Sequence, residues 1–409
     1  MMKSICILFA LMLLSATMFS QVSVKDKVVF TTPQKGYYQT FIQAEVEKFS
    51  AKPKSTKLQM KMDFDIHSLP KSKDEFKSVW HNTPINQGIT GTCWSFCTTS
   101  FYESEINRLH NKKIQLSQMW TAYWEFVEKA RGFVQSRGGT YFGEGSQSNA
   151  VKRIYKKYGI VPFAAYSGLL PGQVVFDHSK MYKEMTDYLE FIKKNNIWSE
   201  NEVVTNIKSI LNYYMGVPPE SFTVDGVTYT PKSYFEKVFP LNLDDYIDIM
   251  SLMEAPFYQY AEYPVPDNWW HNKDYFNVPV TDFMTLVKKA IRSGYSVCIG
   301  GDVSEPGIDG FKEVAMVPTF DIPSEYIDDN SRQFRFSNET STDDHGIHLV
   351  GYKEADGKDW YLIKDSGAGA QNGTNKGYYF YHEDFVKLKM LSFSVHKDVA
   401  KDILAKFRK

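Results

Sequence analysis

Cysteine is scarce in this sequence of 409 residues, which contains only Cys6, Cys93, Cys97 and Cys298. None of them forms a C-x-x-C pair and no histidine cluster accompanies them, so the pattern of a zinc site is missing. Charge of one sign is missing too, because acidic and basic residues almost balance to a formal net charge of -1. The sequence therefore gives no reason to expect nucleic acid or an anionic membrane as the main partner.

Long apolar runs are missing everywhere except at the N-terminus. There Lys3 precedes an unbroken apolar stretch from Ile5 to Leu14, and small and polar residues follow. This is the pattern of a secretory signal peptide, which we place at residues 1–20, and we expect a periplasmic or extracellular protein. A short membrane anchor is the alternative, but a membrane span needs about 20 apolar residues. Cleavage would also remove Cys6, and the odd number of thiols left means that at least one is free.

The remaining chain changes character along its length. Residues 21–80 are Lys-rich and irregular, which favours an N-terminal segment that wraps a domain. Residues 81–169 carry helical periodicity, and residues 170–290 alternate helical segments with proline-rich and aromatic loops. In residues 291–409 the pattern is that of strands, as in Leu391 to Val395, where apolar residues alternate with serines. Helices first and strands later indicate an α+β fold.

The strongest local signal is the segment Gln87-Gly-Ile-Thr-Gly-Thr-Cys93-Trp-Ser-Phe. A helix is predicted to begin near Thr92, which puts Cys93 in its first turn. The helix dipole and the free N–H groups of that turn favour an anion, so they favour the reactive thiolate. The backbone N–H of Cys93 and the side chain of Gln87 would then face a developing oxyanion. A buried structural cysteine is the alternative, and it is our interpretation of Cys97 and Cys298.

Two further segments supply partners for a nucleophilic thiol. In Asp344-His345-Gly346 the histidine lies at the start of a predicted strand, where one ring nitrogen can face the thiol. His348, further along, should lie on the opposite face of that strand and is expected to be structural. Asp365 ends the next predicted strand and would accept a hydrogen bond from the His345 imidazole across a hairpin. A turn-forming aspartate before Ser-Gly is the alternative for Asp365.

These segments, in the order Cys, His and Asp, resemble the papain superfamily, with its Gln…Cys-Trp-Ser/Ala-Phe and Asp-His-Ala/Gly-Val/Ile patterns. Two segments in the middle of the chain, Gly216-Val-Pro-Pro-Glu-Ser-Phe222 and Tyr275-Phe-Asn-Val-Pro-Val280, resemble the bleomycin hydrolase and aminopeptidase C branch. Simple members have roughly 130–150 residues between nucleophile and base. The longer separation in this chain matches the length of its middle region.

The resemblance implies a papain-like fold, with a helical left domain, an antiparallel β-barrel-like right domain and a long helical insertion. It also implies a cysteine peptidase that hydrolyses peptides through a thioester without metal or cofactor, and that acts as an aminopeptidase. An endopeptidase, an acyl transferase and a catalytically weak peptide-binding protein on the same fold are the alternatives. By the same resemblance Cys93, His345, Asp365 and Gln87 are catalytic, and the chain would form a homo-oligomer, the hexameric ring of that branch.

The chain departs from the family pattern at three places. Asp365 stands where Asn is usual, and Gly367 stands where a Trp usually covers the hydrogen bond to the imidazole. The segment from Val395 to Lys409 is basic and does not match the C-terminal tail that fills one end of the cleft in that branch. In those enzymes the tail is what makes the activity that of an aminopeptidase.

Three more residues are expected to line the substrate cleft by resemblance, namely Trp94, Glu144 and Gly145. Glu144 stands where related enzymes commonly have glycine and where the substrate backbone passes. We predict that its carboxylate binds the α-ammonium group of a peptide and so replaces the missing tail. A solvated glutamate near a helix start is the alternative.

Overall fold

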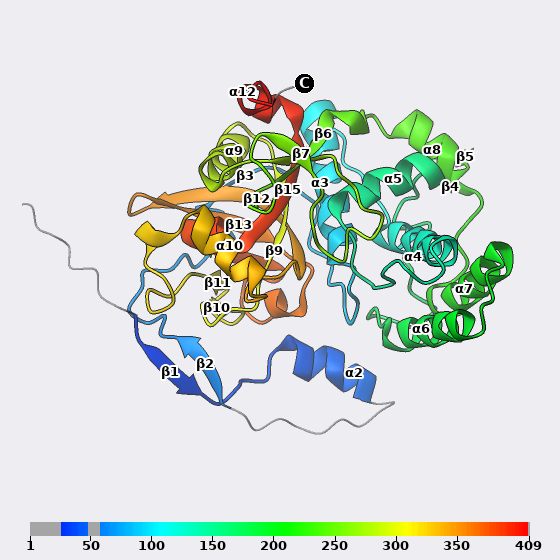
Figure 1. Cartoon of the computed structure of the whole chain (residues 1–409), viewed down its shortest axis with the longest axis horizontal. Helices are drawn as coiled ribbons and strands as arrows, with labels where there is room; N and C mark the ends of the chain where they lie inside the picture. Colours follow the sequence, from blue (N-terminus) through cyan, green and yellow to red (C-terminus); the bar gives the residue numbers. More distant parts are fainter. Residues whose placement is uncertain (1–25, 48–57, 408–409) are drawn as a thin grey trace, which may run out of the picture.

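The computed structural model describes residues 26–47 and 58–407. A helical half and a β half lie against each other, and an N-terminal segment lies outside them (Figure 1). The expected α+β class is confirmed by this arrangement. The two halves meet along one central helix, α3 (Cys93–His110), which begins at Cys93.

The helical half is built from five further helices around an apolar core. They are α4 (Gln118–Gln135), α5 (Ser148–Tyr158), α6 (Ser179–Lys194), α7 (Glu200–Met215) and α8 (Pro231–Val238). The hydroxyl of Ser117 accepts the backbone N–H of Trp120 at 2.9 Å and so caps the start of α4. The buried faces of α4 and α7 meet through Tyr123, Phe126 and Leu211. All five lie in the two regions, 81–169 and 170–290, for which the sequence predicted helices.

The β half contains one large mixed sheet, and eleven of the described strands belong to it. Ten of them follow the order β10 (Ile308–Asp309), β11 (Val314–Ala315), β14 (Tyr378–His382), β13 (Lys358–Lys364), β12 (His345–Ala355), β9 (Val297–Gly301), β15 (Met390–His396), β6 (Tyr246–Met250), β8 (Tyr275–Asn277) and β7 (Gln259–Ala261). The short β3 (Lys77–Ser78) pairs with β12. Helices α9 (Val280–Arg292), α10 (Asp329–Ser337) and α11 (Glu383–Lys389) lie around this sheet.

The region from 170 to 290, expected to be a mainly helical insertion, contributes both helices and strands. Helices α6 to α8 lie in the helical half, and a hairpin of β4 (Phe222–Val224) and β5 (Val227–Tyr229) joins α7 to α8. The next three strands, β6 to β8, extend the main sheet. Helix α9 packs on the same sheet through Phe283, which contacts Phe393 with ring centroids 4.7 Å apart. The boundary expected at residue 290 therefore falls inside an element of the β half.

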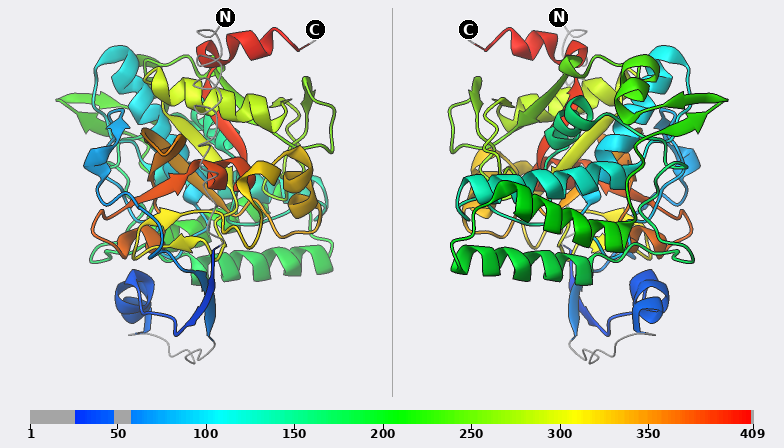
Figure 2. Two further views of the ribbon diagram at one scale, coloured as in Figure 1. Left: turned by 90° about the vertical axis from the view of Figure 1, so that its left-hand side faces the viewer. Right: turned by 90° about the vertical axis from the view of Figure 1, so that its right-hand side faces the viewer.

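The N-terminal segment contacts the β half. Strands β1 (Val28–Thr31) and β2 (Gln59–Met62) form a hairpin, and α2 (Gln43–Glu47) follows a short π-helical turn at Tyr38–Ile42. Figure 2 shows that this hairpin and helix project from the body of the molecule. The hairpin is attached by an ion pair of 2.9 Å between Lys61 and Asp309 and by a hydrogen bond from the Met62 N–H to the Pro306 carbonyl. The expected signal peptide, residues 1–20, lies outside the described residues.

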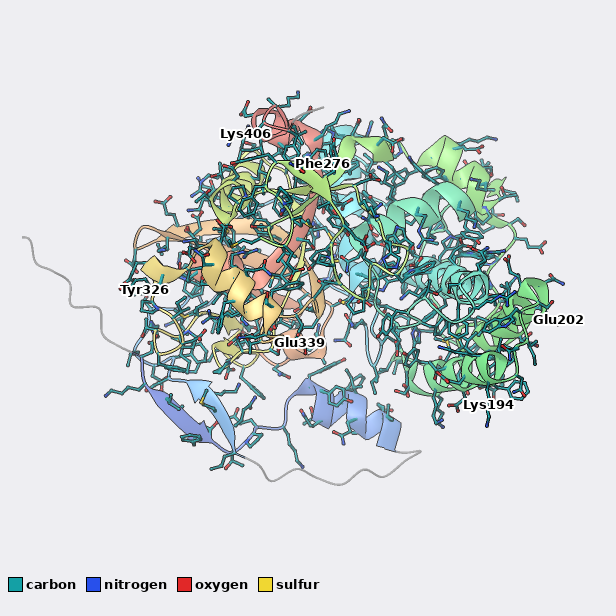
Figure 3. The ribbon with its side chains drawn as sticks, in the orientation of Figure 1. Lys194, Glu202, Phe276, Tyr326, Glu339 and Lys406 are labelled. Atoms are coloured by element: carbon teal, nitrogen blue, oxygen red, sulfur yellow. The ribbon has the colours of Figure 1, made fainter. Side chains whose placement is uncertain are left out.

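The last described segment packs on the outside of the β half. Helix α12 (Lys401–Leu404) is tied to α9 by ion pairs between Lys289 and Asp402 and between Lys406 and Asp282. The ring of Phe407 lies 5.0 Å from that of Phe276, centroid to centroid. Figure 3 labels Phe276 and Lys406 at this end of the molecule.

Candidate active site

A cleft of about 460 Å³ opens where the helical half meets the β half. Its walls come from seven separate parts of the chain: the segment before and at the start of α3, the loop before α5, helix α6, the segment before β8, and strands β9, β12 and β15. Cys93 lies on one wall and His345 on the other, so the two halves contribute the two residues that the sequence paired.

The cysteine, histidine and aspartate of the three motifs come together at this cleft. Cys93 is the first residue of α3 and is partly accessible, whereas Cys97 and Cys298 are buried. His345 is the first residue of β12, and its Nε2 lies 2.8 Å from Oδ1 of Asp365. Asp365 directly follows β13, the antiparallel neighbour of β12. The hairpin thus leaves Nδ1 of His345 as the ring nitrogen that can face the thiol.

The electrostatics of this trio favour a charged imidazole. Burial by itself would lower the pKa of His345, but the Asp365 carboxylate outweighs it and raises the pKa well above its ordinary value. Interaction with Cys93 adds to the same upward shift. Burial opposes ionisation of Asp365, yet His345 and the Gly367 N–H hold its pKa below the usual value. The geometry and the charge of Asp365 therefore favour an imidazolium beside Cys93.

Asp365 holds both roles that its sequence allowed. Its Oδ1 accepts from His345 and also from the backbone N–H of Gly367, which is the bond of a tight turn. Its side chain is 5% exposed and that of His345 is 12% exposed. Gly367 has no aromatic ring to cover the hydrogen bond between Asp365 and His345, but both of these side chains are still shielded from solvent.

Gln87 is fixed beside the nucleophile by its amide group. Its Oε1 accepts from the Ser366 hydroxyl at 2.6 Å, and its Nε2 donates to the Thr90 carbonyl at 2.7 Å. The backbone N–H of Gln87 also donates to the Ser366 carbonyl at 2.8 Å. An amide nitrogen has two hydrogens, so one remains for an oxyanion next to Cys93. Ser366 was missed in the sequence, although it directly follows Asp365.

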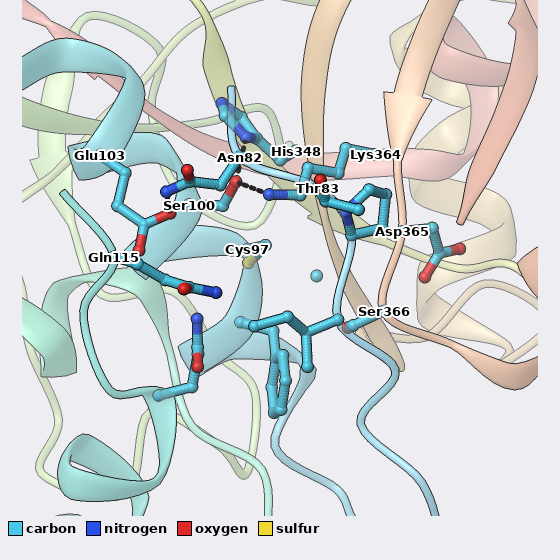
Figure 4. Close-up of a pocket in the computed structure, with 15 residues that line it drawn as sticks. Asn82, Thr83, Cys97, Ser100, Glu103, Gln115, His348, Lys364, Asp365 and Ser366 are labelled. Carbon is cyan, nitrogen blue, oxygen red and sulfur yellow. Dashed lines mark hydrogen bonds between the residues drawn. The ribbon is translucent and has the colours of Figure 1, made fainter. Parts of the chain in front are cut away.

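A buried polar network behind the trio ties α3 to the hairpin (Figure 4). The Ser100 hydroxyl, on α3, lies 2.8 Å from Nδ1 of His348 on β12 and 2.8 Å from Nζ of Lys364 on β13. Burial lowers the pKa of Lys364 to about 8. His348 is fully buried, so its expected structural role is confirmed. The network fixes the end of β13, and with it Asp365, against the helix of the nucleophile.

The three residues expected to line the cleft all do so, but they differ in what they contact. Trp94 is buried and its Nε1 donates to the Glu144 carbonyl at 3.1 Å. The Glu144 carboxylate accepts the Gly91 N–H at 2.8 Å, and its side chain is only 18% exposed. Burial raises its pKa. The alternative of a solvated glutamate is therefore wrong, because the carboxylate is bound to the loop that precedes Cys93.

Two carboxylates of the cleft were not singled out from the sequence. Asp343 lies two residues before His345, and Asp267 lies in the segment between β7 and β8. The run Asp343-Asp344-His345 was visible as a motif, and both of its aspartates line the cleft, but nothing in the sequence indicated that Asp343 would lie near Asp267. The position of Asp267 beside the cleft depends on contacts with residues far away in the sequence, and no local sequence pattern predicts such contacts.

Metal and membrane features were searched in the part of the chain that the structure describes. No group of three or more His, Cys, Asp or Glu side chains is arranged there to hold a metal ion. No helix among these residues is long and apolar enough to cross a bilayer.

Comparison with known proteins agrees with this site. The sequence profile of the Peptidase C1-like family matches residues 140–409, which include His345 and Asp365. The chain belongs to the Peptidase C1-like family. It is a cysteine peptidase of the papain superfamily, as the sequence predicted.

Several curated relatives of this C1-like peptidase are named aminopeptidases. Aminopeptidase C of Streptococcus thermophilus is 23% identical over 388 residues, which cover 81% of this chain and 82% of the relative. Aminopeptidase G of Lactobacillus delbrueckii subsp. lactis is 24% identical over 367 residues, which cover 76% of this chain and 80% of the relative. The crystal structure of PepW from Lactobacillus rhamnosis HN001 is similar with a TM-score of 0.62 at 19% identity, over 82% of this chain and 88% of that one. This likeness confirms the papain-like fold.

Proposed function

We propose that this C1-like peptidase is an aminopeptidase that removes residues from the N-terminus of peptides. The observation that carries the proposal is the position of His345 between Asp365 and the nucleophile, on a cleft that is also lined by carboxylates. The relatives named aminopeptidase C support the direction of cleavage.

The residues of the cleft suit a thioester mechanism. The Cys93 thiolate attacks the carbonyl carbon of the scissile bond, and the oxyanion that forms is met by the Cys93 N–H and by Nε2 of Gln87. His345 gives a proton to the leaving amine as the C–N bond breaks, and the acyl group stays on sulfur. Water then loses a proton to His345 and attacks the thioester, which releases the acid and restores the thiol. Asp365 holds the imidazole in position throughout.

The test compares fluorogenic peptides that differ only in their N-terminus, one free and one acetylated. We expect the wild-type enzyme to cleave the free peptide and to leave the acetylated one nearly intact. Equal cleavage of both, or cleavage inside a longer blocked peptide, would identify an endopeptidase of the same mechanism. Product ligation in excess amine would identify an acyl transferase.

We also propose that residues 1–20 direct export, so that the mature enzyme acts in the periplasm or outside the cell. The support is the sequence of Lys3 and the apolar stretch that follows it. N-terminal sequencing of the mature protein, together with cell fractionation, tests this. An intact N-terminus on protein in the cytosolic fraction would contradict it.

A homo-oligomer, hexameric by resemblance, is a further proposal, which light scattering of the purified protein tests.

A further inference from the structure

The far end of the cleft brings together carboxylates from three distant parts of the chain, namely Glu144, Asp267 and Asp343. They are not equivalent. Glu144 is occupied by the Gly91 N–H, and its Oε2 lies 3.8 Å from Nδ1 of His178. That imidazole is 3% exposed, and neither of its ring nitrogens has a hydrogen-bond partner among the described residues. Glu144 is therefore bound to protein, as is Asp343 through the side chains of Gln147 and Tyr263, whereas the carboxylate of Asp267 lines the cleft without a hydrogen-bond partner among the described residues.

Asp267 lies directly over the loop where a substrate backbone is expected. A Cβ atom added to Gly145 would lie 1.9 Å from Oδ2 of Asp267, so any other residue at position 145 would require this carboxylate to move. The carboxylate thus covers the cleft above Gly145. In the part of the chain that the structure describes, the Asp267 carboxylate forms neither an ion pair within 4.0 Å nor a hydrogen bond.

The neighbours of Asp267 in sequence hold it in this place. Asn268 is buried, and its Nδ2 donates to the carbonyls of Tyr263 at 3.0 Å and Asn272 at 2.9 Å. Trp269 donates from Nε1 to Oε1 of Glu125 at 2.7 Å. Because the residues next to Asp267 are anchored to the core, the carboxylate does not depend on a loose loop for its position.

Asp343 completes the pair from the opposite wall. One of its oxygens accepts from the Gln147 side chain. Burial, followed by the charge of Asp267, raises the pKa of Asp343 to about 7. Burial also raises the pKa of Asp267, and the charge of Lys129 opposes this shift. Lys129 itself donates to the carbonyls of Gly143 and Gly145. Two crowded carboxylates thus share a site to which no described lysine, arginine or histidine is bonded.

We propose that Asp267 and Asp343 together bind the α-ammonium group of the peptide substrate. The inference rests on the proposed aminopeptidase function and names the residues that would set it. An ammonium group between the two carboxylates relieves their repulsion. It also donates charge-assisted hydrogen bonds to their oxygens, in place of the water that burial removes. Because Asp267 covers the cleft above Gly145, the N-terminus of the substrate ends at this point.

The experiment uses the full-length enzyme with the variants Asp267→Asn and Asp343→Asn, and Asp274→Asn as the matched control. Asp274 is an exposed acid of the same segment, and it lies outside the cleft. Three fluorogenic peptides are compared. The first has a free N-terminus, and the second is its acetylated form. The third is also acetylated, and it has a lysine one position N-terminal to the residue whose carbonyl group is attacked. Loss of a charge-assisted bond should lower kcat/KM for the free peptide roughly 10- to 100-fold. Cleavage of the acetylated peptide should stay the same or rise.

The outcomes distinguish an α-ammonium group from the ammonium group of a lysine side chain as the group that is bound. If Asp267→Asn lowers only the cleavage of the blocked lysine peptide, the site binds a basic side chain and the proposal is wrong. If the wild-type enzyme prefers free amines and Asp267→Asn and Asp343→Asn keep that preference, the anchor lies elsewhere, and Glu144→Gln is the variant that then identifies it. If the wild-type enzyme shows no preference at all, the aminopeptidase function itself fails. Asp274→Asn should behave as wild type in every assay.

Discussion

At the scale of single residues, the three thiols of the described chain have different surroundings. Burial and the neighbouring Cys298 raise the pKa of the Cys97 thiol well above its usual value, so it stays protonated and inert. The Sγ atoms of Cys97 and Cys298 lie 3.3 Å apart in the core. Cys93, at the mouth of the cleft, is the thiol within reach of a reagent.

We therefore expect Cys93→Ala to lower turnover by several orders of magnitude while the protein stays folded. A peptidyl epoxide should label the folded wild-type enzyme at Cys93 alone and should not label the variant. Turnover of substrate and circular dichroism of both proteins check this, and mass spectrometry locates the label. A purified variant that keeps more than a small fraction of wild-type turnover would overturn the assignment of the nucleophile.

Asp365 gives the second prediction at this scale. Asn at this position can still accept a hydrogen bond from the imidazole, so Asp365→Asn should keep substantial activity. The carboxylate, however, is what raises the pKa of His345. Without that negative charge the imidazolium loses its proton at lower pH, and the alkaline limb of the profile of kcat/KM against pH should move to lower pH. An unchanged profile would mean that Asp365 does not orient His345.

At the scale of elements, helix α3 and strand β12 meet so closely that the residue after His345 must be small. A Cβ atom on Gly346 would lie 2.9 Å from Sγ of Cys97 and 3.4 Å from Cα of Trp94. Cys97 has little room to turn away, because Cys298 lies against it. The contact thus sets the separation of the two elements that carry Cys93 and His345.

Gly346→Ala should push α3 away from β12 and reduce kcat, since a misplacement of about 1 Å can cost about 100-fold in rate. Overpacking of this kind should also lower the free energy of unfolding by about 1–3 kcal/mol. The double variant Cys97→Ala/Gly346→Ala removes the sulfur and should regain both activity and stability, and Cys97→Ala alone serves as the control. Steady-state kinetics and urea unfolding measure these effects. Wild-type kinetics of Gly346→Ala would show that the two elements adapt freely.

The elements of this chain were largely predictable because their periodicity is strong. The buried positions of α6 and α7 recur at helical spacing, and Met390–His396 alternates small polar and large apolar residues. The strands β6, β7 and β8 were missed because they are short. The partner of β6 is β15, far along the chain, and β7 pairs with β8 across the Asp267 segment. Short strands depend on such partners and not on local preference.

At the scale of the whole molecule, the near-zero net charge does not indicate that the cleft is lined by acidic residues. A formal net charge of -1 gives no hint that Glu144, Asp267 and Asp343 meet. The meeting of Cys93, His345 and Asp365 could be predicted because each of them lies in a recognisable motif. The carboxylates at the far end could not, because their role depends on distances set by the packing of the two halves.

The C-terminal segment gives the last prediction, because in this chain it packs away from the cleft. No described residue after Phe393 lines the cleft, and Phe407 instead contacts Phe276, Tyr258 and Tyr260. Phe407→Ala should therefore lower the free energy of unfolding by about 1–2 kcal/mol, through lost apolar contact of a partly buried ring. The preference for a free N-terminus should stay unchanged, both in this variant and after deletion of residues 401–409.

The matched control is Phe334→Ala, whose ring is 67% exposed and should contribute little to stability. Urea unfolding gives the change in stability, and the pair of free and acetylated peptides gives the preference. Loss of the preference in the deletion variant, with the fold intact, would show that the C-terminal segment reaches the cleft and anchors the substrate amine. Retention of the preference would mean that groups within the cleft bind the substrate amine, and Asp267→Asn tests one of these groups directly.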